Sequence, residues 1–145
     1  LKNIGFFYFG LNDINIKMGN QFLFESIAYD LLKPYFDLLN KKKLSFGFGG
    51  MAKLNEGMLP GKLVLSEHIR HNSNYVILSR AFHNNSSTYD EFKKNVDLKY
   101  EIKLIENYIN ENKNNEKLLD DNHLKLKNVV SNIVNSDLLK SYKNK

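Results

Sequence analysis

Three short apolar runs that alternate with helix-like segments constrain this chain more than any other feature. The runs are residues 4–9 (Ile-Gly-Phe-Phe-Tyr-Phe), 44–48 and 75–78 (Tyr-Val-Ile-Leu). A continuous apolar run is typical of a strand that is buried on both faces, as in a parallel sheet covered by helices. Residues 22–40 and 60–71 have apolar side chains at helical spacing. The order β-α-β-α-β therefore predicts a parallel α/β layer with right-handed crossovers.

Proline, serine and threonine mark the expected helix boundaries. Pro34 should kink or split the helix over 22–40, and Pro60 suits the first turn of the next helix. Thr88 with Glu91 resembles a capping box at the start of a helical C-terminal part. That part is divided by a polar hinge over 110–115 into two helices, over residues 88–112 and 115–134. We accordingly expect a sheet-containing segment, 1–87, and C-terminal helices, 88–145, that pack on it or on a partner.

Composition excludes several classes of protein. The 145 residues are 42% apolar and 26% charged and include no Cys, so disulfides, a thiolate nucleophile and thiolate metal sites are absent. No apolar run approaches the ~18 residues that span a bilayer, and we expect a cytoplasmic protein without a membrane partner. The net charge of +5 comes from interspersed basic and acidic residues, which does not favour nucleic-acid binding.

Polar or glycine-rich residues follow each predicted strand. They are Gly10-Leu11-Asn12-Asp13, Gly47-Phe48-Gly49-Gly50 and Ser79-Arg80. Ligands of parallel α/β proteins gather at the C-terminal ends of the strands. We therefore expect these three segments to converge on one face and to form the binding site.

Each candidate residue also has a structural interpretation. Asp13 suits a hard divalent cation, but Asx residues also form turns and helix caps. Gly49 and Gly50 let a ligand approach the backbone, yet glycines commonly form turns at strand ends. Arg80 can clamp a substrate carboxylate with two parallel hydrogen bonds, or it can pair with a neighbouring acidic residue. His83, just past the third strand, is a candidate for acid–base chemistry.

Other polar residues indicate structure more than chemistry. His68 and His71 lie three apart on the predicted helix, as in some metal-binding pairs, although partial burial or a surface position explains them more simply. Adjacent helical residues do not face each other, so Ser66, Glu67 and His68 form no catalytic relay. Asp30 is expected on a solvated helix face.

The segment 6–14, continuing to Met18-Gly19, resembles the stretch of the phosphoenolpyruvate/pyruvate-superfamily barrels that carries a metal-binding Asp. In HpcH/HpaI-type 2-oxo-acid aldolases this stretch is a strand followed by Gly-Pro-Ala-Asp-Leu. In phosphoenolpyruvate-utilising phosphotransferases it is Phe-Phe-Ser-Phe-Gly-Thr-Asn-Asp-Leu. Residues 57–82 look closest to the citrate-lyase-like branch. The resemblance implies an α/β fold that is the C-terminal part of a TIM-type barrel, about three βα units, followed by a helical tail.

The resemblance also implies an activity and a ligand set. Asp13 would bind Mg²⁺ or Mn²⁺, with Asn12 beside it in the substrate pocket. By position, Gly49, Gly50 and Arg80 would line that pocket. The expected function is that of a metal-dependent carbon–carbon lyase or aldolase that acts on a 2-oxo acid through a pyruvate enolate.

Three of eight strands do not make a complete barrel. The companion metal-binding Glu of the family is also missing, so we expect a missing N-terminal barrel half or a partner chain, and a homo-oligomer. One alternative is the phosphoenolpyruvate-binding part of a phosphotransferase, which Asn12 favours, although Phe48-Gly49-Gly50 replaces that family's Cys-Gly-Glu. The other alternative is a non-catalytic α/β interaction module.

Overall fold

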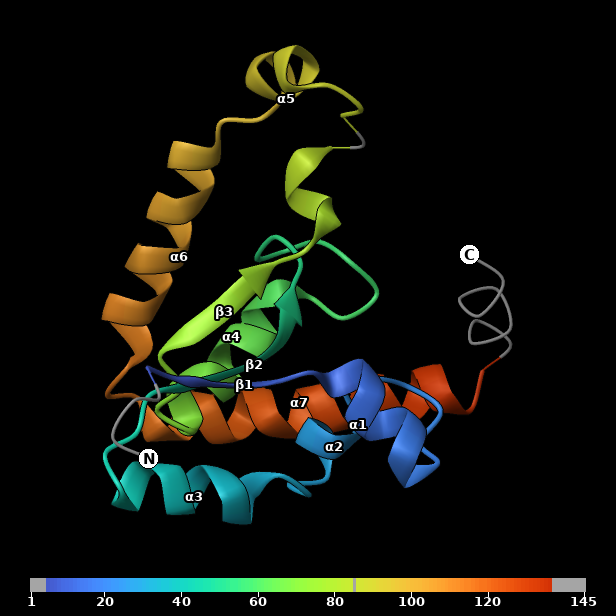
Figure 1. The fold of residues 1–145 in the computed structure, drawn as a ribbon, viewed down its shortest axis with the longest axis vertical. Helices are drawn as coiled ribbons and strands as arrows, with labels where there is room; N and C mark the ends of the chain where they lie inside the picture. The colour runs from blue at the N-terminus through green and yellow to red at the C-terminus, as the bar shows by residue number, and fades with distance from the viewer. Residues whose placement is uncertain (1–4, 85, 137–145) are drawn as a thin grey trace.

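A parallel three-stranded sheet organises the chain, whose residues 5–84 and 86–136 are described in a computed structural model. The strands are β1 (Phe7–Phe9), β2 (Phe46–Met51) and β3 (Tyr75–Leu78), and they lie in the order β1-β2-β3 (Figure 1). Both pairings are parallel. The structure confirms the predicted parallel α/β layer, while residue 4 of the first predicted strand lies outside the described residues.

Helices connect and follow the strands. They are α1 (Leu11–Met18), α2 (Glu25–Ala28), α3 (Lys33–Lys41), α4 (Gly61–Arg70), the 3-10 helix η1 (Arg80–His83), α5 (Tyr89–Asn95), α6 (Leu98–Asn112) and α7 (Glu116–Val134). Pro34 lies in the first turn of α3, so the predicted helix over 22–40 is split there. Helix α1 was not expected from the sequence.

The single helix predicted over 88–112 is wrong, because the chain breaks between α5 and α6. Asp97 starts a new helix there, and its side chain accepts a hydrogen bond from the backbone N–H of Tyr100. The predicted capping box is present. Thr88 accepts from the N–H of Glu91, and the Glu91 carboxylate accepts from the N–H of Ser87.

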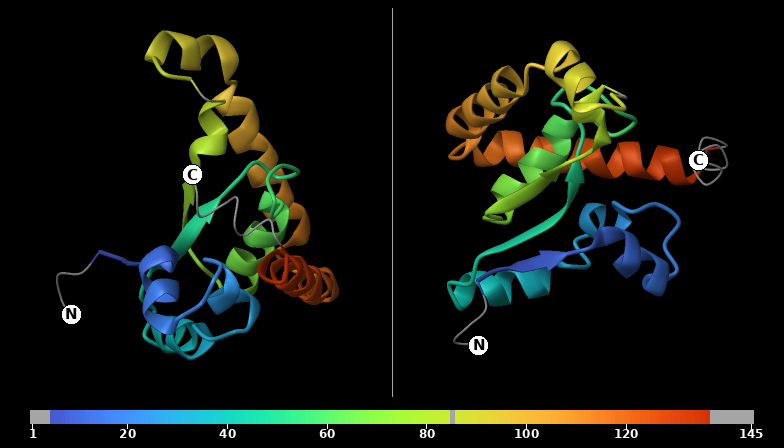
Figure 2. Two further views of the ribbon diagram at one scale, coloured as in Figure 1. Left: turned by 90° about the vertical axis from the view of Figure 1, so that its right-hand side faces the viewer. Right: turned by 45° about the horizontal axis from the view of Figure 1, so that its top comes forward.

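Helices cover one face of the sheet. Phe46 and Phe48 of β2 are fully buried, and both stack on Phe36 of α3 with ring centroids 5.0 and 5.1 Å apart. Helix α7 packs against α4 and α2 (Figure 2). Leu126 and Val130 of α7 are fully buried. The apolar positions of the last helix therefore belong to the core that supports the sheet.

The opposite face of the sheet is open. Tyr75 and Ile77 of β3 are 46% and 56% exposed, and the ring of Phe6 lies 4.9 Å from that of Tyr75. Among the described residues, β1 and β3 each pair with β2 alone, so both edges of the sheet are unpaired. Parallel sheets are usually covered on both faces, which makes this exposed apolar surface unusual.

Strand β2 contains an extra residue where it pairs with β3. Gly47 pairs with Tyr75 and Gly50 with Ile77, so three steps along β2 match two along β3. Gly49 has φ +55°, a conformation that favours glycine. The Tyr8 hydroxyl links β2 and β3 at this irregularity. It donates to the Gly49 carbonyl and accepts from the Ile77 N–H at 3.0 Å. Burial raises the pKa of Tyr8, although the Ile77 hydrogen bond acts in the opposite direction.

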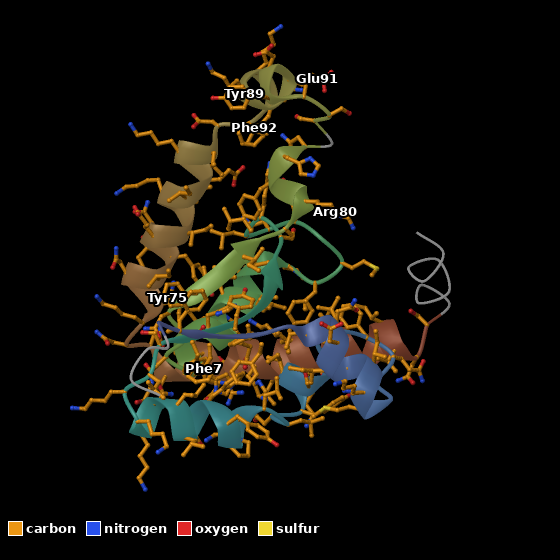
Figure 3. All side chains as sticks on the ribbon, viewed as in Figure 1. Phe7, Tyr75, Arg80, Tyr89, Glu91 and Phe92 are labelled. Carbon is orange, nitrogen blue, oxygen red and sulfur yellow. The ribbon has the colours of Figure 1, made fainter. Side chains whose placement is uncertain are left out.

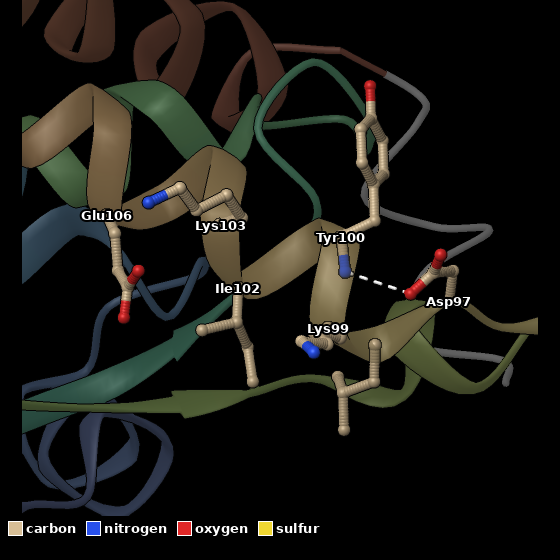
Figure 4. A pocket seen from close by; sticks show the side chains of 7 residues that line it. Asp97, Lys99, Tyr100, Ile102, Lys103 and Glu106 are labelled. Atoms are coloured by element: carbon tan, nitrogen blue, oxygen red, sulfur yellow. Dashed lines mark hydrogen bonds between the residues drawn. The ribbon is translucent and has the colours of Figure 1, made fainter.

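Helix α5 lies apart from the sheet, and α6 runs from it back to α4 (Figure 1). Ile105 of α6 is buried, and the Tyr108 hydroxyl lies 2.8 Å from that of Ser66 in α4. None of the residues of α5 is buried. A hollow of about 680 Å³ runs along the first part of α6 (Figure 4), lined by Asp97, Leu98, Lys99, Tyr100, Ile102, Lys103 and Glu106. An ion pair of 3.2 Å between Lys53 and Glu101 ties α6 to the loop after β2. Of the helices in the described ranges, none has the length and apolar character needed to cross a membrane.

Candidate functional site

The C-terminal ends of the three strands meet in one open pocket of about 480 Å³. We call it the strand-end pocket. It is lined by Tyr8, Gly10, Leu11, Asn12, Leu23, Gly49, Gly50, Ile77, Leu78, Ser79 and Arg80. Residues from all three predicted segments contribute to it, as the parallel topology requires. The structure thus brings together Asn12, Gly49, Gly50 and Arg80.

Arg80 provides the charge of the strand-end pocket, because no other lining residue is ionised at neutral pH. It is exposed, it begins η1, and it has no ion-pair partner within the described ranges. Figure 3 shows it at the opposite end of the sheet from Phe7 and Tyr75. The neighbouring Ser79 accepts a hydrogen bond from the N–H of Ala81 and so caps η1. A free guanidinium beside glycine backbone is suited to an anionic ligand.

Two predicted site residues do not line this pocket. Asp13 is exposed in the first turn of α1, where a carboxylate interacts favourably with the helix dipole. His83 ends η1, and its Nδ1 atom is buried without a hydrogen-bond partner. Neither residue joins the group of potential metal ligands described below.

A second polar site lies on the helix-covered side of the sheet. It consists of Asp30, Glu67, Arg70, His71 and His123, which we call the carboxylate–histidine cluster. Asp30 follows α2 and has φ +54°. Glu67 and Arg70 belong to the last turn of α4, which His71 ends, and His123 belongs to α7. Three separate segments of the chain therefore meet at this point.

The two sites lie at opposite ends of α4. The N–H of Gly61, where α4 begins, donates to the carbonyl of Lys53 just after β2. At the other end, the carbonyl of His71 accepts a hydrogen bond of 2.9 Å from the side chain of Asn40, at the end of α3. Because α4 has ten residues, its ends are about 15 Å apart. The strand-end pocket and the cluster are therefore separate sites.

The polar atoms of the cluster are closely spaced. His71 Nε2 lies 3.5 Å from Glu67 Oε2 and 3.7 Å from Asp30 Oδ1. His123 lies 3.0 Å from Glu67 Oε1 through Nδ1 and 3.5 Å from Asp30 Oδ2 through Nε2. One ligand atom each from Asp30, Glu67 and His71 fall within 4.8 Å of one another, so this group could hold a metal ion.

The side chain of Glu67 is fully buried but remains acidic. Burial by itself raises the pKa of a carboxyl group. Hydrogen bonds from His123 and His71 and the charge of Arg70 outweigh burial and lower the pKa of Glu67 to about 2. Burial also acts to lower the pKa of Arg70, but the charge of Glu67 and the bonds to Asp30 and Glu67 raise it. Glu67 and Arg70 are thus held as ions inside the protein.

His68 and His71 do not form a metal-binding pair. The ring of His68 stacks on Phe48 with centroids 3.9 Å apart, and its Nδ1 lies 2.8 Å from the Ser73 hydroxyl. Its Nε2 is buried without a hydrogen-bond partner. Burial, followed by the nearby His71, lowers the pKa of His68 to about 3, so His68 is neutral. Both histidines are buried, as the simpler sequence interpretation allowed, but only His71 belongs to the cluster.

The sequence interpretation of the cluster was incomplete. Asp30 was expected on a solvated helix face, and this is wrong, because it lies in a turn and pairs with Arg70. Arg70 and His123 were not recognised as candidates. Glu67, Arg70 and His71 follow the i, i+3, i+4 spacing of one helix face, which was an available signal. Nothing local in the sequence connects them to His123, which is 52 residues from His71 in the chain.

Comparisons of the chain with protein-family models, with curated proteins and with solved structures found no match. A proposal for the function therefore depends on the two sites and on the resemblance of residues 6–19. Of the two, the strand-end pocket is open, whereas the cluster is mostly enclosed and has Glu67 and His71 buried within it.

Proposed function

We propose that the strand-end pocket binds the carboxylate of a small 2-oxo acid, and that the chain is the C-terminal part of a (β/α)8-barrel carbon–carbon lyase or aldolase. One observation carries this proposal. Three parallel strand ends meet in one pocket, and Arg80 is its charged lining residue. A pocket at this edge of a parallel sheet is where such folds bind substrates.

Arg80 is the proposed carboxylate clamp. Its guanidinium can donate two parallel hydrogen bonds to a carboxylate, and it lacks a competing acidic partner in the described part of the chain. Asn12 adds an amide that can donate to a keto oxygen. Gly49 and Gly50 line the pocket with backbone atoms rather than side chains.

The open side of the sheet supports assignment to a larger sheet. Tyr75 and Ile77 expose apolar surface on the face opposite the helices, and both sheet edges lack partners among the described residues. Further parallel strands would pair with these edges and cover this face, as in a closed barrel. The order strand, helix, strand, helix, strand with helices on one face agrees with the resemblance.

The proposed Mg²⁺ or Mn²⁺ ion is not supported by this chain alone. The resemblance places it on Asp13, which is exposed and offers one carboxylate. The described residues that group as potential metal ligands are Asp30, Glu67 and His71, away from Asp13. The donor set around Asp13 therefore does not fit a complete site. Substrate binding is therefore the step that the residues of this chain support.

Thermal unfolding with added oxalate or pyruvate tests this function. A ligand that binds only the folded state raises the melting temperature, so millimolar oxalate should stabilise the wild-type chain. Arg80→Ala should weaken binding about tenfold or more, because it removes a charge-assisted hydrogen bond of about 1.5–3 kcal/mol. Lys41→Ala removes an exposed cation in the last turn of α3 and serves as the control. An equal shift in wild type and Arg80→Ala would refute the carboxylate clamp.

The phosphotransferase alternative is favoured by one observation, the position of Asn12 in the pocket. The phosphotransferase stretch that residues 6–14 resemble has an Asn directly before the Asp, as Asn12 precedes Asp13 in this chain. Phosphoenolpyruvate should then stabilise the chain more than pyruvate does at equal concentration. The lyase proposal predicts no advantage of phosphoenolpyruvate over pyruvate in the same melting experiment.

A further inference from the structure

We propose that the carboxylate–histidine cluster is a transition-metal site of the Zn²⁺ class. Its ligands would be Asp30, Glu67, His71 and His123, and Arg70 would occupy the position of the ion when no metal is bound. The inference goes beyond the proposed function, since the cluster and the strand-end pocket lie at opposite ends of α4.

The cluster converges on a single cationic nitrogen. Nη2 of Arg70 lies 2.9 Å from Glu67 Oε2 and 3.2 Å from both His71 Nε2 and His123 Nδ1, and it also contacts Asp30 Oδ1. This nitrogen carries two protons, enough for the two carboxylate oxygens but not for the two imidazole nitrogens as well. A metal ion at the same point could accept electron pairs from all four.

The distances from His71 to Glu67 and Asp30 are close to those of tetrahedral coordination. Metal–ligand bonds of 2.0–2.1 Å place neighbouring ligand atoms about 3.3–3.4 Å apart. His71 Nε2 is 3.5 Å from Glu67 Oε2 and 3.7 Å from Asp30 Oδ1. Asp30, Glu67 and His71 already offer ligand atoms within 4.8 Å of one another. His123 Nδ1 lies 3.0 Å from the other Glu67 oxygen, Oε1, so the His123 side chain would have to turn to become the fourth ligand.

The chemistry of the donors selects the class of metal. Two imidazoles with two carboxylates suit Zn²⁺ and related ions, whereas Mg²⁺ and Ca²⁺ prefer sets made of oxygen alone. The charge also fits, because a divalent ion neutralises two carboxylates completely and Arg70 neutralises one.

The cluster is partly exposed, so a metal ion can reach it from the solvent. The side chains of Glu67 and His71 are 0% and 4% exposed, while those of Arg70 and Asp30 are 18% and 35% exposed. Metal would enter on the side of Asp30. Arg70, whose long side chain already reaches the surface, would swing into solvent.

Zn²⁺ titration of the full chain by calorimetry at neutral pH tests the proposal. Wild type should bind one equivalent. Arg70→Met keeps a similar side-chain length but removes the competing cation, so it should bind Zn²⁺ at least tenfold more tightly. His71→Ala and His123→Ala should each weaken binding at least tenfold, and His83→Ala, outside the cluster, should bind as wild type does. Co²⁺ should give the intense visible absorption of a tetrahedral site in wild type and lose it in His71→Ala.

The same experiment can overturn the proposal. If Arg70→Met binds Zn²⁺ no more tightly than wild type, or if His71→Ala and His123→Ala keep wild-type affinity, the cluster is an ion-pair network only. Arg70→Met leaves two buried carboxylates without their cation, which can prevent folding. In that case, refolding with one equivalent of Zn²⁺, seen by circular dichroism, supports the site. Failure to refold, together with no Co²⁺ spectrum in wild type, refutes it.

Discussion

At the scale of single residues, neighbouring side chains in α4 have different charge states. Glu67 and His68 are adjacent and both buried, yet one is held as an anion and the other as a neutral ring. The difference arises from their partners, since Glu67 faces Arg70 and two histidines while His68 faces Phe48 and Ser73. A sequence shows the residue types at such positions but not which groups surround them, and so it could not predict these opposite states.

The buried neutral state of His68 predicts a pH dependence of stability. Its pKa is about 3 in the folded protein against 6.5 for the free side chain. As pH falls below 6.5, the unfolded state takes up a proton that the folded state does not, so stability is lost. His68→Gln should remove this part of the loss, which can reach about 1.4 kcal/mol per pH unit.

Urea unfolding of wild type and His68→Gln between pH 6.5 and 4.5 measures this effect. The range lies above the pH at which Glu67 loses its charge in the folded protein. The free energy of unfolding of wild type should exceed that of His68→Gln most at pH 6.5, and this difference should become smaller toward pH 4.5. If the difference in the free energy of unfolding did not change with pH, His68 would take up its proton in the folded protein as it does in the unfolded one.

At the scale of elements, hydrophobic periodicity predicted β3, α4 and α7 closely. It did not predict the helix and strand boundaries that are set by single glycines or short polar segments. Gly10 and Gly19 delimit α1, which the periodicity of an eight-residue helix did not reveal. Strand β2 extends through Gly49 and Gly50 to Met51 instead of ending at residue 48, because the Tyr8 hydroxyl and the irregular pairing with β3 accommodate the glycines.

The pairing of β2 with β3 depends on Gly47. A Cβ atom there would lie 2.4 Å from the Tyr75 carbonyl oxygen and 2.7 Å from the Tyr8 ring. Gly47→Ala should therefore destabilise the protein by about 2 kcal/mol, as overpacking usually does. Gly5→Ala is the matched control, because its Cβ would have nothing within 4 Å. Chemical denaturation gives both values, and a change below about 0.5 kcal/mol for Gly47→Ala would contradict the packing described here.

At the scale of the whole molecule, the parallel topology and the convergence of the strand ends could be predicted, because both follow from the order of apolar runs. The carboxylate–histidine cluster could not, because it requires α7 to pack on α4 and α2. His123 reaches Glu67 only through that packing. The open face of the sheet could not be predicted either, since a sequence pattern shows that a strand is apolar but not which residues cover it.

The most direct measurement of the central claim is an NMR titration of the isotope-labelled chain with oxalate. Binding at the strand-end pocket predicts saturable shifts of the amide signals of Gly49, Gly50, Ser79 and Arg80, with those of His71 unchanged. Absence of shifts at these four residues, or shifts confined to other parts of the chain, would contradict the proposal that the strand ends form a carboxylate-binding site.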